Sequence, residues 1–427
     1  MANDNEAVGN RPGPRLWLAP AVIVTVVMAA LAALYLGSTV QSSKHLDGFP
    51  VAVVDADTGA TGPSGQRVEV GKQVADGLRK GVDGEKFDLR FVSLDAVKEE
   101  MGKGKLYGAI VLPPDLSTKL VALTASAATG GDARQPEVTV YTNPLANTSS
   151  TAVVNSFASQ ALAQANQSVG KQLLATASSA SGTARIVLSE PMRVRVTPFE
   201  KVPDGTGGGL SAFYYALLLA LAGFTGSLIA TSLVDARLGF TPSEIGPLYR
   251  MESHSGRSRL ATLVLKWGIM AGISVLVSSA YLGIADWTGM PLDHPGKLWL
   301  FSVLSIAAVA VVAQAILALL GSLGMVVNLF LFVVLSIPSS GGTTPLEAMP
   351  PFIRFLSSFE PLHQIYLGTR SILYFGATGD SGLTRAVVAA AIALILGLLA
   401  GALGTRAYDL KGLARKHGAP AVAVASS

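Results

Sequence analysis

The stretch LWLFSVLSIAAVAVVAQAILALLGSLGMVVNLFLFVVLSI, residues 298–337, indicates membrane spans because it holds no charged side chain. A helix that crosses the hydrocarbon core of a bilayer needs roughly 20 mostly apolar residues. The run is therefore about long enough for two crossings. Glycines at 321 and 324 favour a tight turn near its middle. We expect two spans here, a full one over residues 298–320 and a short one over residues 324–337.

Four further windows contain at most one charged residue: residues 16–36, 210–234, 260–285 and 386–405. The first of them resembles a signal peptide, with Arg11 and Arg15 as its basic region. Its apolar run is longer than the roughly 7 to 15 residues of a cleaved signal, so we expect a retained anchor. The chain is thus predicted to be a polytopic α-helical membrane protein with six spans, and a small α/β extracytoplasmic domain is inserted between spans 1 and 2.

Composition agrees with a membrane protein. The 427 residues are 50% hydrophobic and 14% charged, the mean hydropathy is +0.47, and there is no cysteine. An ordinary globular domain carries about 25% charged residues, and a disordered chain needs low hydrophobicity and high net charge, so the composition fits neither class. The absence of cysteine excludes a disulfide scaffold. The formal net charge is +4 and the pI is about 9.2. This excess is small for the length of the chain, so the position of the basic residues says more about a possible nucleic-acid partner than their number does.

The excess of positive charge lies outside the segment from Thr39 to Gly209. That segment holds 17 basic and 17 acidic residues, which leaves 32 − 17 = 15 basic and 28 − 17 = 11 acidic residues elsewhere. With six spans and a cytoplasmic N-terminus, about ten of these basic residues flank the spans inside and about four lie in short outer loops, as the positive-inside rule expects. The high pI therefore records orientation in a plasma membrane, and we expect no nucleic-acid partner.

The segment 39–209 is predicted to fold as an α/β layer, because strand-like and helical stretches alternate along it. Strand-like runs cover residues 49–57, 87–92, 107–113, 136–143 and 185–202. Helical runs cover residues 68–81, 94–104, 114–127 and a long Ala/Ser/Gln-rich stretch over 149–180. The sequence PDGTGGG at 203–209 is typical of a hinge before the second span.

Two motifs in this segment invite a chemical interpretation. Asp55 and Asp57 have the spacing of some metal and sugar-nucleotide sites, but aspartates at a strand end more often accept hydrogen bonds from backbone N–H groups of a turn. GKGK at 102–105 is reminiscent of phosphate binding, yet the chain contains no GxxxxGK[ST] run. We favour the turn interpretation for both motifs.

Three stretches carry a resemblance to a known family: FPVAVVDADTG, LDAVKEEMGKGKLYGAIVLPPDLS, and SIPSSGGTTPLEAMPPFIRFLSSFEPLHQIYLGTRSILYFG, residues 336–376. Together with the order of one span, a large domain and five spans, they resemble the YhgE/Pip-like branch of the type-2 ABC exporter permease family. The resemblance implies a membrane subunit with a separate cytoplasmic ABC ATPase, usually working as a homodimer or paired permease. The uncharged windows divide the chain into a cytoplasmic tail (1–15), a first span (16–38), the outer domain (39–209), a membrane domain (210–408) and a cytoplasmic tail (409–427).

The third stretch lies in a segment, residues 338–383, that we expect to dip into the membrane from outside. Non-helical backbone at membrane depth is tolerated only where protein or a water-filled cavity satisfies it. The flanking sequences, with Arg354, His363 and Arg370, resemble helices lying at the interface. The candidate residues of an outer gate are Gly341, Gly342, Pro345, Glu347, Pro350, Glu360 and Arg370. The alternative is an outer loop with short amphipathic helices and no transport role.

Few polar residues lie within the spans. Gln314 and Asn328, with Thr225 and Ser227, are candidates for lining a path, although hydrogen bonding between helices is the more common role of such residues. Lys266 lies close enough to the cytoplasmic end of its span to reach the headgroups, so we expect it to snorkel. No carboxylate is expected in the middle of the membrane, which disfavours proton coupling.

The chain contains no Walker motif and no room for a nucleotide-binding domain, so no cofactor is expected on it and energy from ATP would have to come through a partner subunit. The expected docking surface is the cytoplasmic loop 235–259, with Thr241, Glu244, Arg250 and Arg257 as candidate contacts. TPSE at 241–244 resembles a capped helix start with Thr241 as the N-cap. The alternative is a basic loop that serves orientation alone.

Two functions follow as hypotheses. The leading one is a permease subunit, not itself an enzyme, that exports a hydrophobic or amphipathic molecule such as a drug, a lipid or an envelope precursor. The other is a non-transporting envelope protein whose outer domain binds a secreted partner or a phage. No nucleophile elbow or metal-ligand spacing stands out in support of an enzyme.

Overall fold

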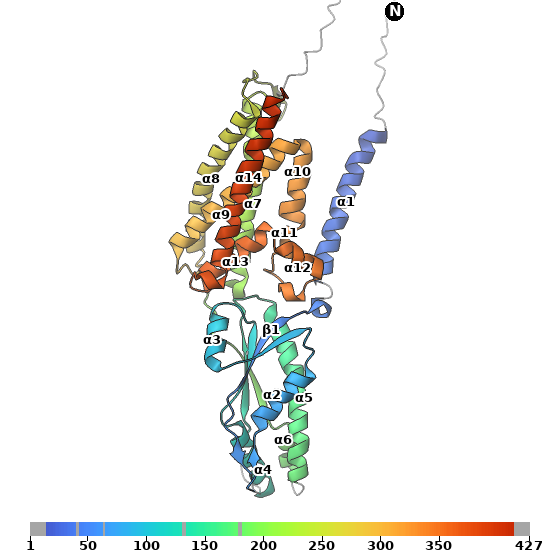
Figure 1. Ribbon diagram of the computed structural model, residues 1–427, viewed down its shortest axis with the longest axis vertical. Coiled ribbons are helices and arrows are strands. Elements are labelled where there is room, and N and C mark those ends of the chain that lie inside the picture. Colours follow the sequence, from blue (N-terminus) through green and yellow to red (C-terminus); the bar gives the residue numbers. More distant parts are fainter. Residues whose placement is uncertain (1–13, 40–41, 63–64, 130–133, 178–181, 414–427) are drawn as a thin grey trace, which may run out of the picture.

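The computed structural model describes residues 14–39, 42–62, 65–129, 134–177 and 182–413. A helical bundle and an α/β domain lie end to end, and helix α1 (Pro14–Thr39) stands beside the bundle (Figure 1). The α/β domain follows α1 in the sequence and precedes α7 (Leu210–Arg237), so the chain leaves the helical part once and returns.

The α/β domain is built, in its described part, on a five-stranded sheet of order β4-β1-β5-β6-β7. The strands are β1 (Phe49–Asp55), β4 (Phe87–Phe91), β5 (Gly108–Leu112), β6 (Glu137–Thr142) and β7 (Arg193–Pro198). Strand β1 runs parallel to both neighbours, and Val51 faces Leu89 on one side and Gly108 on the other. Strand β6 is antiparallel to β5 and parallel to β7. A separate small ladder joins β2 (Ala60–Thr61) and β3 (Arg67–Val68).

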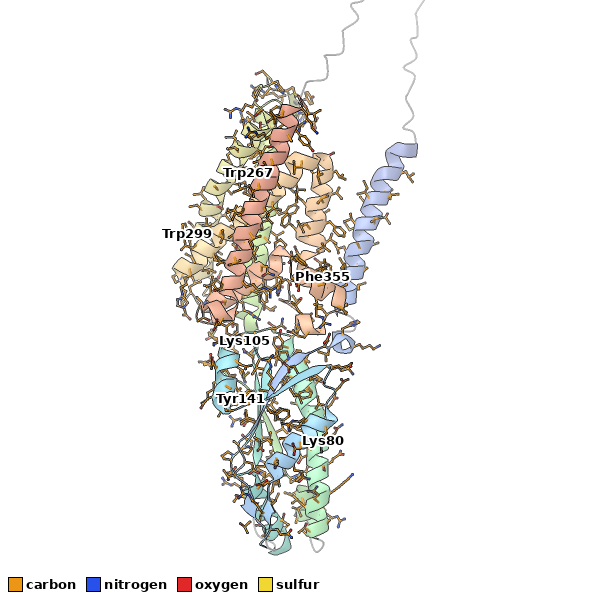
Figure 2. All side chains as sticks on the ribbon, viewed as in Figure 1. Lys80, Lys105, Tyr141, Trp267, Trp299 and Phe355 are labelled. Carbon is orange, nitrogen blue, oxygen red and sulfur yellow. The ribbon has the colours of Figure 1, made fainter. Side chains whose placement is uncertain are left out.

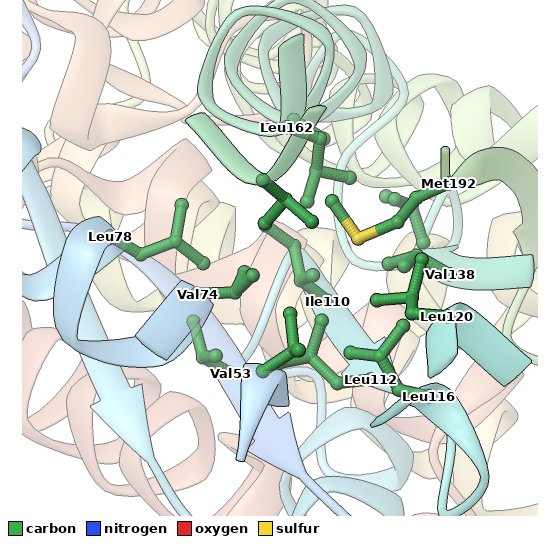
Figure 3. Packing of buried hydrophobic residues seen from close by; sticks show 14 of the residues in the cluster. Val53, Val74, Leu78, Ile110, Leu112, Leu116, Leu120, Val138, Leu162 and Met192 are labelled. Carbon is green, nitrogen blue, oxygen red and sulfur yellow. The ribbon is translucent and has the colours of Figure 1, made fainter. Parts of the chain in front are cut away.

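Helices cover both faces of this sheet. They are α2 (Val70–Gly81), α3 (Leu94–Gly102), α4 (Leu116–Thr129), α5 (Ser150–Thr176) and α6 (Gly182–Ser189). Because successive side chains of a strand point to opposite faces, Val51 and Val53 enter the larger core with α2, α4 and α5, whereas Ala52 and Val54 pack with residues of α3. Figure 3 shows the larger core, in which Val53, Ile110 and Leu162 converge from β1, β5 and α5.

The strand predicted over residues 185–202 is only partly correct. Residues up to Ser189 form helix α6, and the strand is confined to β7, Arg193–Pro198. Leu188 of α6 is fully buried in the core shared with α5. Pro191 separates the helix from the strand. The apolar residues that suggested one long strand therefore belong to two elements.

Within the described residues, five helices are long and apolar enough to cross a membrane, as in a polytopic helical membrane protein. They comprise α7, α8 (Arg259–Trp287), α9 (Pro295–Leu320), the composite helix Ser322–Ser339, and α14 (Leu383–Leu410). Helix α1 contains a shorter apolar stretch, Ala21–Gly37. The hydroxyl of Tyr35 in α1 donates to the carbonyl oxygen of Val333 at 3.3 Å, which places α1 against the composite helix.

The long uncharged run divides where its glycines predicted. Helix α9 ends at Leu320 and α10 (Ser322–Leu329) begins two residues later, with Gly321 at φ +60° between them. A side chain at Gly324 would lie 2.7 Å from the carbonyl oxygen of Ile316, so the two helices leave no room for one. Beyond α10 the chain forms a π-helical turn, η3 (Phe330–Val334), and then α11 (Ser336–Ser339). Such π-turns are frequent at functional sites.

The helix predicted to start at Thr241 is wrong. Residues Ser243–Ile245 (β8) and Leu248–Arg250 (β9) form a hairpin, in which Ile245 pairs with Leu248. Gly246 sits at the turn with φ +58°, a conformation that suits a two-residue hairpin loop. The stretch between Pro242 and Gly246 is too short to sustain an isolated helix.

Candidate functional site

The segment 338–383 lies between the helical bundle and the α/β domain (Figure 1). After α11 it contains η4 (Leu346–Ala348), α12 (Pro351–Ser357), α13 (Pro361–Tyr374) and η5 (Gly379–Ser381). Pro351 and Pro361 each occupy the first turn of a helix, where the missing N–H costs nothing. Pro345 and Pro350, two of the predicted residues, hold extended backbone immediately before η4 and α12. The prolines therefore set where each short helix starts.

Gly341 and Gly342 lie where the segment approaches both domains most closely. Gly341 has φ +70°, which disfavours any residue with a side chain. A Cβ added at Gly342 would overlap the ring of Phe213 in α7. The carbonyl oxygens of both glycines accept from the Nδ2 of Asn147 in the α/β domain, at 2.8 and 3.3 Å. The glycines thus let the segment backbone contact α7 on one side and the α/β domain on the other.

Asn147 has two roles that sequence reasoning missed. Its Oδ1 accepts from the backbone N–H groups of Ser149 and Ser150, at 3.0 and 3.1 Å, at the start of α5. Its Nδ2 makes the two bonds to the 338–383 segment, and the side chain is buried. A single amide therefore caps the long helix of the α/β domain and fixes that helix to the segment. The signal in the sequence was the run Asn-Thr-Ser-Ser at 147–150, a common cap pattern that gives no hint of the distant contact.

Glu347 provides a second link between the domains. Its Oε2 accepts from the hydroxyl of Tyr107 in the α/β domain at 3.0 Å, and its carbonyl oxygen accepts from the N–H of Asp47 at 2.9 Å. Burial, together with the neighbouring Glu347 carboxylate, raises the pKa of the Tyr107 phenol well above its usual range. Tyr107 therefore remains a hydrogen-bond donor throughout the physiological pH range. Asp47 also pairs with Arg354 of α12.

Arg370 forms a third link, and it corrects the prediction that the helix around it lies at the membrane interface. Its side chain is buried, and one guanidinium nitrogen donates to the carbonyl oxygen of Ala146. The guanidinium carbon lies 5.5 Å from the ring centroids of both Tyr366 and Phe375. His363 on the same helix is buried as well. Helix α13 is enclosed because it packs against α7, α9 and α14 of the bundle, while Arg370 also contacts Ala146 of the α/β domain. Local sequence patterns do not reveal these neighbours.

Glu360 fixes the start of α13 to the end of the composite helix. Its Oε2 accepts from the backbone N–H of His363 at 2.8 Å, and its Oε1 accepts from the hydroxyl of Ser336 at 2.7 Å. The Nδ1 of His363 lies 2.7 Å from the carbonyl oxygen of Ser340. These contacts hold α11 and α13 together, and the buried Glu360 carboxylate is satisfied by them.

The GKGK turn also lies at this junction, where Figure 2 places Lys105. A Cβ on Gly104 would come within 2.9 Å of the Phe375 ring. Lys103 bonds the Glu99 carboxylate at 2.7 Å and approaches Asp380 at 3.5 Å. The turn is therefore part of the contact between the α/β domain and the 338–383 segment.

A cavity of about 390 Å³ lies directly inside this segment. Its lining comes from α9, the π-helical turn η3, the start of α13 and α14, and it is almost wholly apolar. Representative lining residues are Val309, Phe332, Ile365, Ala393 and Gly397. Gln364 is the main polar group in it, and its Nε2 donates to the carbonyl oxygen of Ser357 at 3.2 Å. The cavity has the volume and the apolar lining of a site for a small hydrophobic molecule.

The remaining predicted residues are not brought to this site. Asn328 donates through Nδ2 to the carbonyl oxygen of Ala313 at 3.0 Å, so it holds α10 against α9. Ser227 likewise donates to Gly223 and Ala310. Gln314 lines a different cavity, near the ends of α7 and α8. These contacts agree with the role of hydrogen bonding between helices for Asn328 and Ser227.

The prediction that Lys266 snorkels towards the headgroups is wrong. Its ammonium pairs with a carboxylate oxygen of Asp235 on α7 at 2.8 Å, and the two side chains are 6% and 10% exposed. Asp235 lies directly after the uncharged window that ended at Val234. The sequence does not show that the packing of α7 against α8 brings these two charges together, so an unpaired Lys266 was expected.

Thr241, Glu244, Arg250 and Arg257 lie on the loop between α7 and α8, at the end of the bundle far from the 338–383 segment (Figure 1). Arg250 pairs with Glu252 at 2.9 Å. The hairpin exposes apolar side chains, with Ile245 73% and Leu248 71% accessible. The loop therefore presents both basic and apolar groups to whatever lies on that side.

Asp57 is used structurally. Its carboxylate accepts from the backbone N–H groups of Gly71 and Ser117, at 3.0 and 2.9 Å, and from the hydroxyl of Ser117. These bonds lie at the starts of α2 and α4, 14 and 60 residues away in the sequence, so Asp57 caps two helices and does not form the local turn that was predicted for it. Asp55 accepts from the N–H of Asp57 at 3.1 Å, and partial burial raises the pKa of Asp55. Among the described residues, no three His, Cys, Asp or Glu side chains come together in a way that could hold a metal ion.

Comparison with known proteins assigns the chain to a family. The family described as protein of unknown function (DUF3533) matches residues 20–396, and the chain belongs to it. The match runs from α1 through the α/β domain and the 338–383 segment into α14. No curated protein matches the chain. No solved structure matches it.

Proposed function

We propose that the protein is the membrane subunit of an exporter that moves a hydrophobic or amphipathic molecule out of the cell. The observation that carries this proposal is the apolar cavity of about 390 Å³ beneath the 338–383 segment. A hydrophobic molecule in the bilayer would lose little by entering such a lining, whereas a polar solute would leave its hydrogen bonds unmade. Drugs, lipids and envelope precursors have the required chemistry.

In this proposal, the 338–383 segment is the outer gate of the cavity. Ile365 and Gln364 of α13 line the cavity, while Tyr366 and Arg370 of the same helix contact Ala146 of the α/β domain. Movement of the α/β domain would therefore move the helix that closes the cavity. This arrangement favours a role in transport over that of a surface loop.

The proposed topology has six spans, with α1 as the first, both termini in the cytoplasm and the α/β domain outside the plasma membrane. The basic residues of the α7–α8 loop support this orientation through the positive-inside rule. Three exposed aromatic residues near α12 support an outer membrane boundary at that level. Phe352, Phe355 and Phe359 are strongly exposed, as suits aromatic side chains at a membrane interface (Figure 2 labels Phe355).

Energy would come from a separate cytoplasmic ATPase, and the β8–β9 hairpin is the proposed contact. Its exposed Ile245 and Leu248, with Arg250 and Arg257 nearby, provide an apolar tip beside basic groups, which suits a protein partner. A second copy of the chain, or a related permease, would complete the assembly.

The experiment compares cells that lack the protein with cells that express it. Accumulation of lipophilic fluorescent dyes is measured in both, and the protein is affinity-purified from mild detergent. We expect lower dye accumulation in the expressing cells and an ATPase in the purified sample. Equal accumulation in both strains, with no ATPase recovered, would contradict the proposal.

A non-transporting envelope protein is the second candidate, and one observation favours it. The α/β domain carries a groove of about 490 Å³ between the end of α2, β4 and α5, lined by Phe87, Phe157 and Gln160 among others. Such a groove could hold an extended segment of a secreted protein or a phage protein. If the α/β domain, attached to an unrelated membrane anchor, restores the wild-type phenotype to a deletion strain, this second function is correct.

A further inference from the structure

A second cavity, of about 360 Å³, lies where α7 and α9 end and α8 begins. Its lining includes Asp235, Arg259, Lys266 and Gln314, together with Ser322 at the start of α10. None of these residues lines the apolar cavity beneath the 338–383 segment. The helix ends place the second cavity at the headgroup level of a bilayer, on the side opposite the α/β domain (Figure 1).

The buried amide of Gln314, unpaired within the described part of the chain, indicates that the cavity holds an occupant. The Gln314 side chain is 1% exposed, and neither its Oε1 nor its Nε2 has a hydrogen-bond partner among the described residues. The hydroxyl of Thr231 on α7, which also lines the cavity, is likewise buried and without such a partner. Buried polar groups in native proteins are almost always hydrogen-bonded, and an unpaired amide is costly. Two such groups facing one polar cavity indicate that something in the cavity bonds to them.

The charges around the cavity select the kind of occupant. Lys266 is paired with Asp235, so the two cations and one carboxylate of the lining leave one net positive charge, that of Arg259, whose Nε donates to the carbonyl oxygen of Leu413. The start of helix α10 at Ser322 adds the positive end of a helix dipole. Both features favour a negatively charged group. Beside two further threonines, Thr241 and Thr262, the lining has apolar side chains that suit an occupant with an attached hydrocarbon part: Phe240, Leu263, Leu317, Ala318 and Met325.

We propose that this cavity binds the phosphate headgroup of an anionic phospholipid. Gln314 donates to the headgroup through Nε2 and accepts from a headgroup hydroxyl through Oε1, and the Lys266–Asp235 pair lies beside the phosphate. The site joins α7, α8, α9 and α10 at the end of the bundle that carries the hairpin loop. It is independent of any transported molecule, so it stands whether or not the protein is an exporter.

The test uses the purified full-length protein in detergent and native mass spectrometry to count bound lipids. The probes are dioctanoyl phosphatidylglycerol, dioctanoyl phosphatidylcholine and inorganic phosphate. Gln314→Leu is the main variant, because it removes the amide and leaves a side chain of similar volume in a buried position. Thr231→Val is the second variant. Ser278→Ala is the matched control, since the Ser278 hydroxyl is also buried without a hydrogen-bond partner among the described residues, but it lies on α8 and lines neither cavity.

We expect tighter binding of phosphatidylglycerol than of phosphatidylcholine, and about tenfold weaker binding of phosphatidylglycerol by Gln314→Leu. Ser278→Ala should bind as the unmodified protein does. Competition by inorganic phosphate would show that the phosphate alone is recognised, and its absence would show that the whole headgroup is required; either result supports the phosphate site. Equal binding of the two lipids, unchanged binding by Gln314→Leu, or an equal loss in Ser278→Ala would overturn the proposal.

Discussion

Replacing Asn147 by Asp should release the 338–383 segment from the α/β domain while leaving helix α5 capped. The carboxylate can still accept from the N–H groups of Ser149 and Ser150, as the amide oxygen does at 3.0 and 3.1 Å. It cannot donate to the carbonyl oxygens of Gly341 and Gly342, which Nδ2 reaches at 2.8 and 3.3 Å. The substitution therefore separates the two roles of one side chain.

The size of the effect follows from the two lost bonds. A neutral hydrogen bond contributes about 1 kcal/mol net, so the free energy of opening the segment should fall by about 2 kcal/mol. Repulsion between the carboxylate and the two carbonyl oxygens adds to this. Amide hydrogens of residues 338–348 should then exchange about thirtyfold faster.

The assay is hydrogen exchange on the full chain in detergent, read by mass spectrometry. Asn147→Ala is the comparison, since it removes the cap as well and should also speed exchange at the start of α5 by the equivalent of about 1 kcal/mol. Unchanged protection of residues 338–348 in Asn147→Asp would show that this amide does not hold the segment.

Three further predictions concern the packing that supports the site. Gly342→Ala should lower the free energy of unfolding by about 1–3 kcal/mol, because its Cβ overlaps Phe213, and Phe213→Leu should recover part of the loss in calorimetry; no recovery would place the strain elsewhere. Lys266→Met should lower the free energy of unfolding by about 3–5 kcal/mol, because it leaves the buried Asp235 carboxylate without its cation. Adding Asp235→Leu should restore most of that stability, and a double variant as unstable as the single one would contradict the pairing. Asp57→Ala should lower the stability of the α/β domain by about 1–3 kcal/mol through the caps of α2 and α4, and an unchanged melting temperature would refute that role.

The apolar spans were predictable because a bilayer imposes a length on each of them. The uncharged run 298–337 and its glycines located α9, the turn and the composite helix. The strands around Val51 and Ile110 were equally clear, since both are buried on two faces. Helix α6 and the β8–β9 hairpin were missed because their short sequences fit more than one local structure, and tertiary contacts decide between them.

The site was predictable only in its outline. Glycines and prolines between 338 and 383 predicted an irregular segment, and the structure has short helices and turns there. The contacts of Arg370 with Ala146 and of Gly341 with Asn147 could not be predicted, because the partners lie 224 and 194 residues apart in the sequence. The Lys266–Asp235 pair was missed because the sequence does not show which residues of two packed helices face each other.

The most direct test of the proposed path is to fill the apolar cavity. Ala393 on α14 lines it, whereas Val388 on the same helix is 50% exposed and faces away from the bundle core. Accumulation of lipophilic dyes is measured in cells that express Ala393→Phe or Val388→Phe at equal levels. We expect cells that express Ala393→Phe to accumulate dye as a deletion strain does, and cells that express Val388→Phe to keep accumulation low. Low accumulation with Ala393→Phe would contradict the claim that a hydrophobic molecule passes through this cavity.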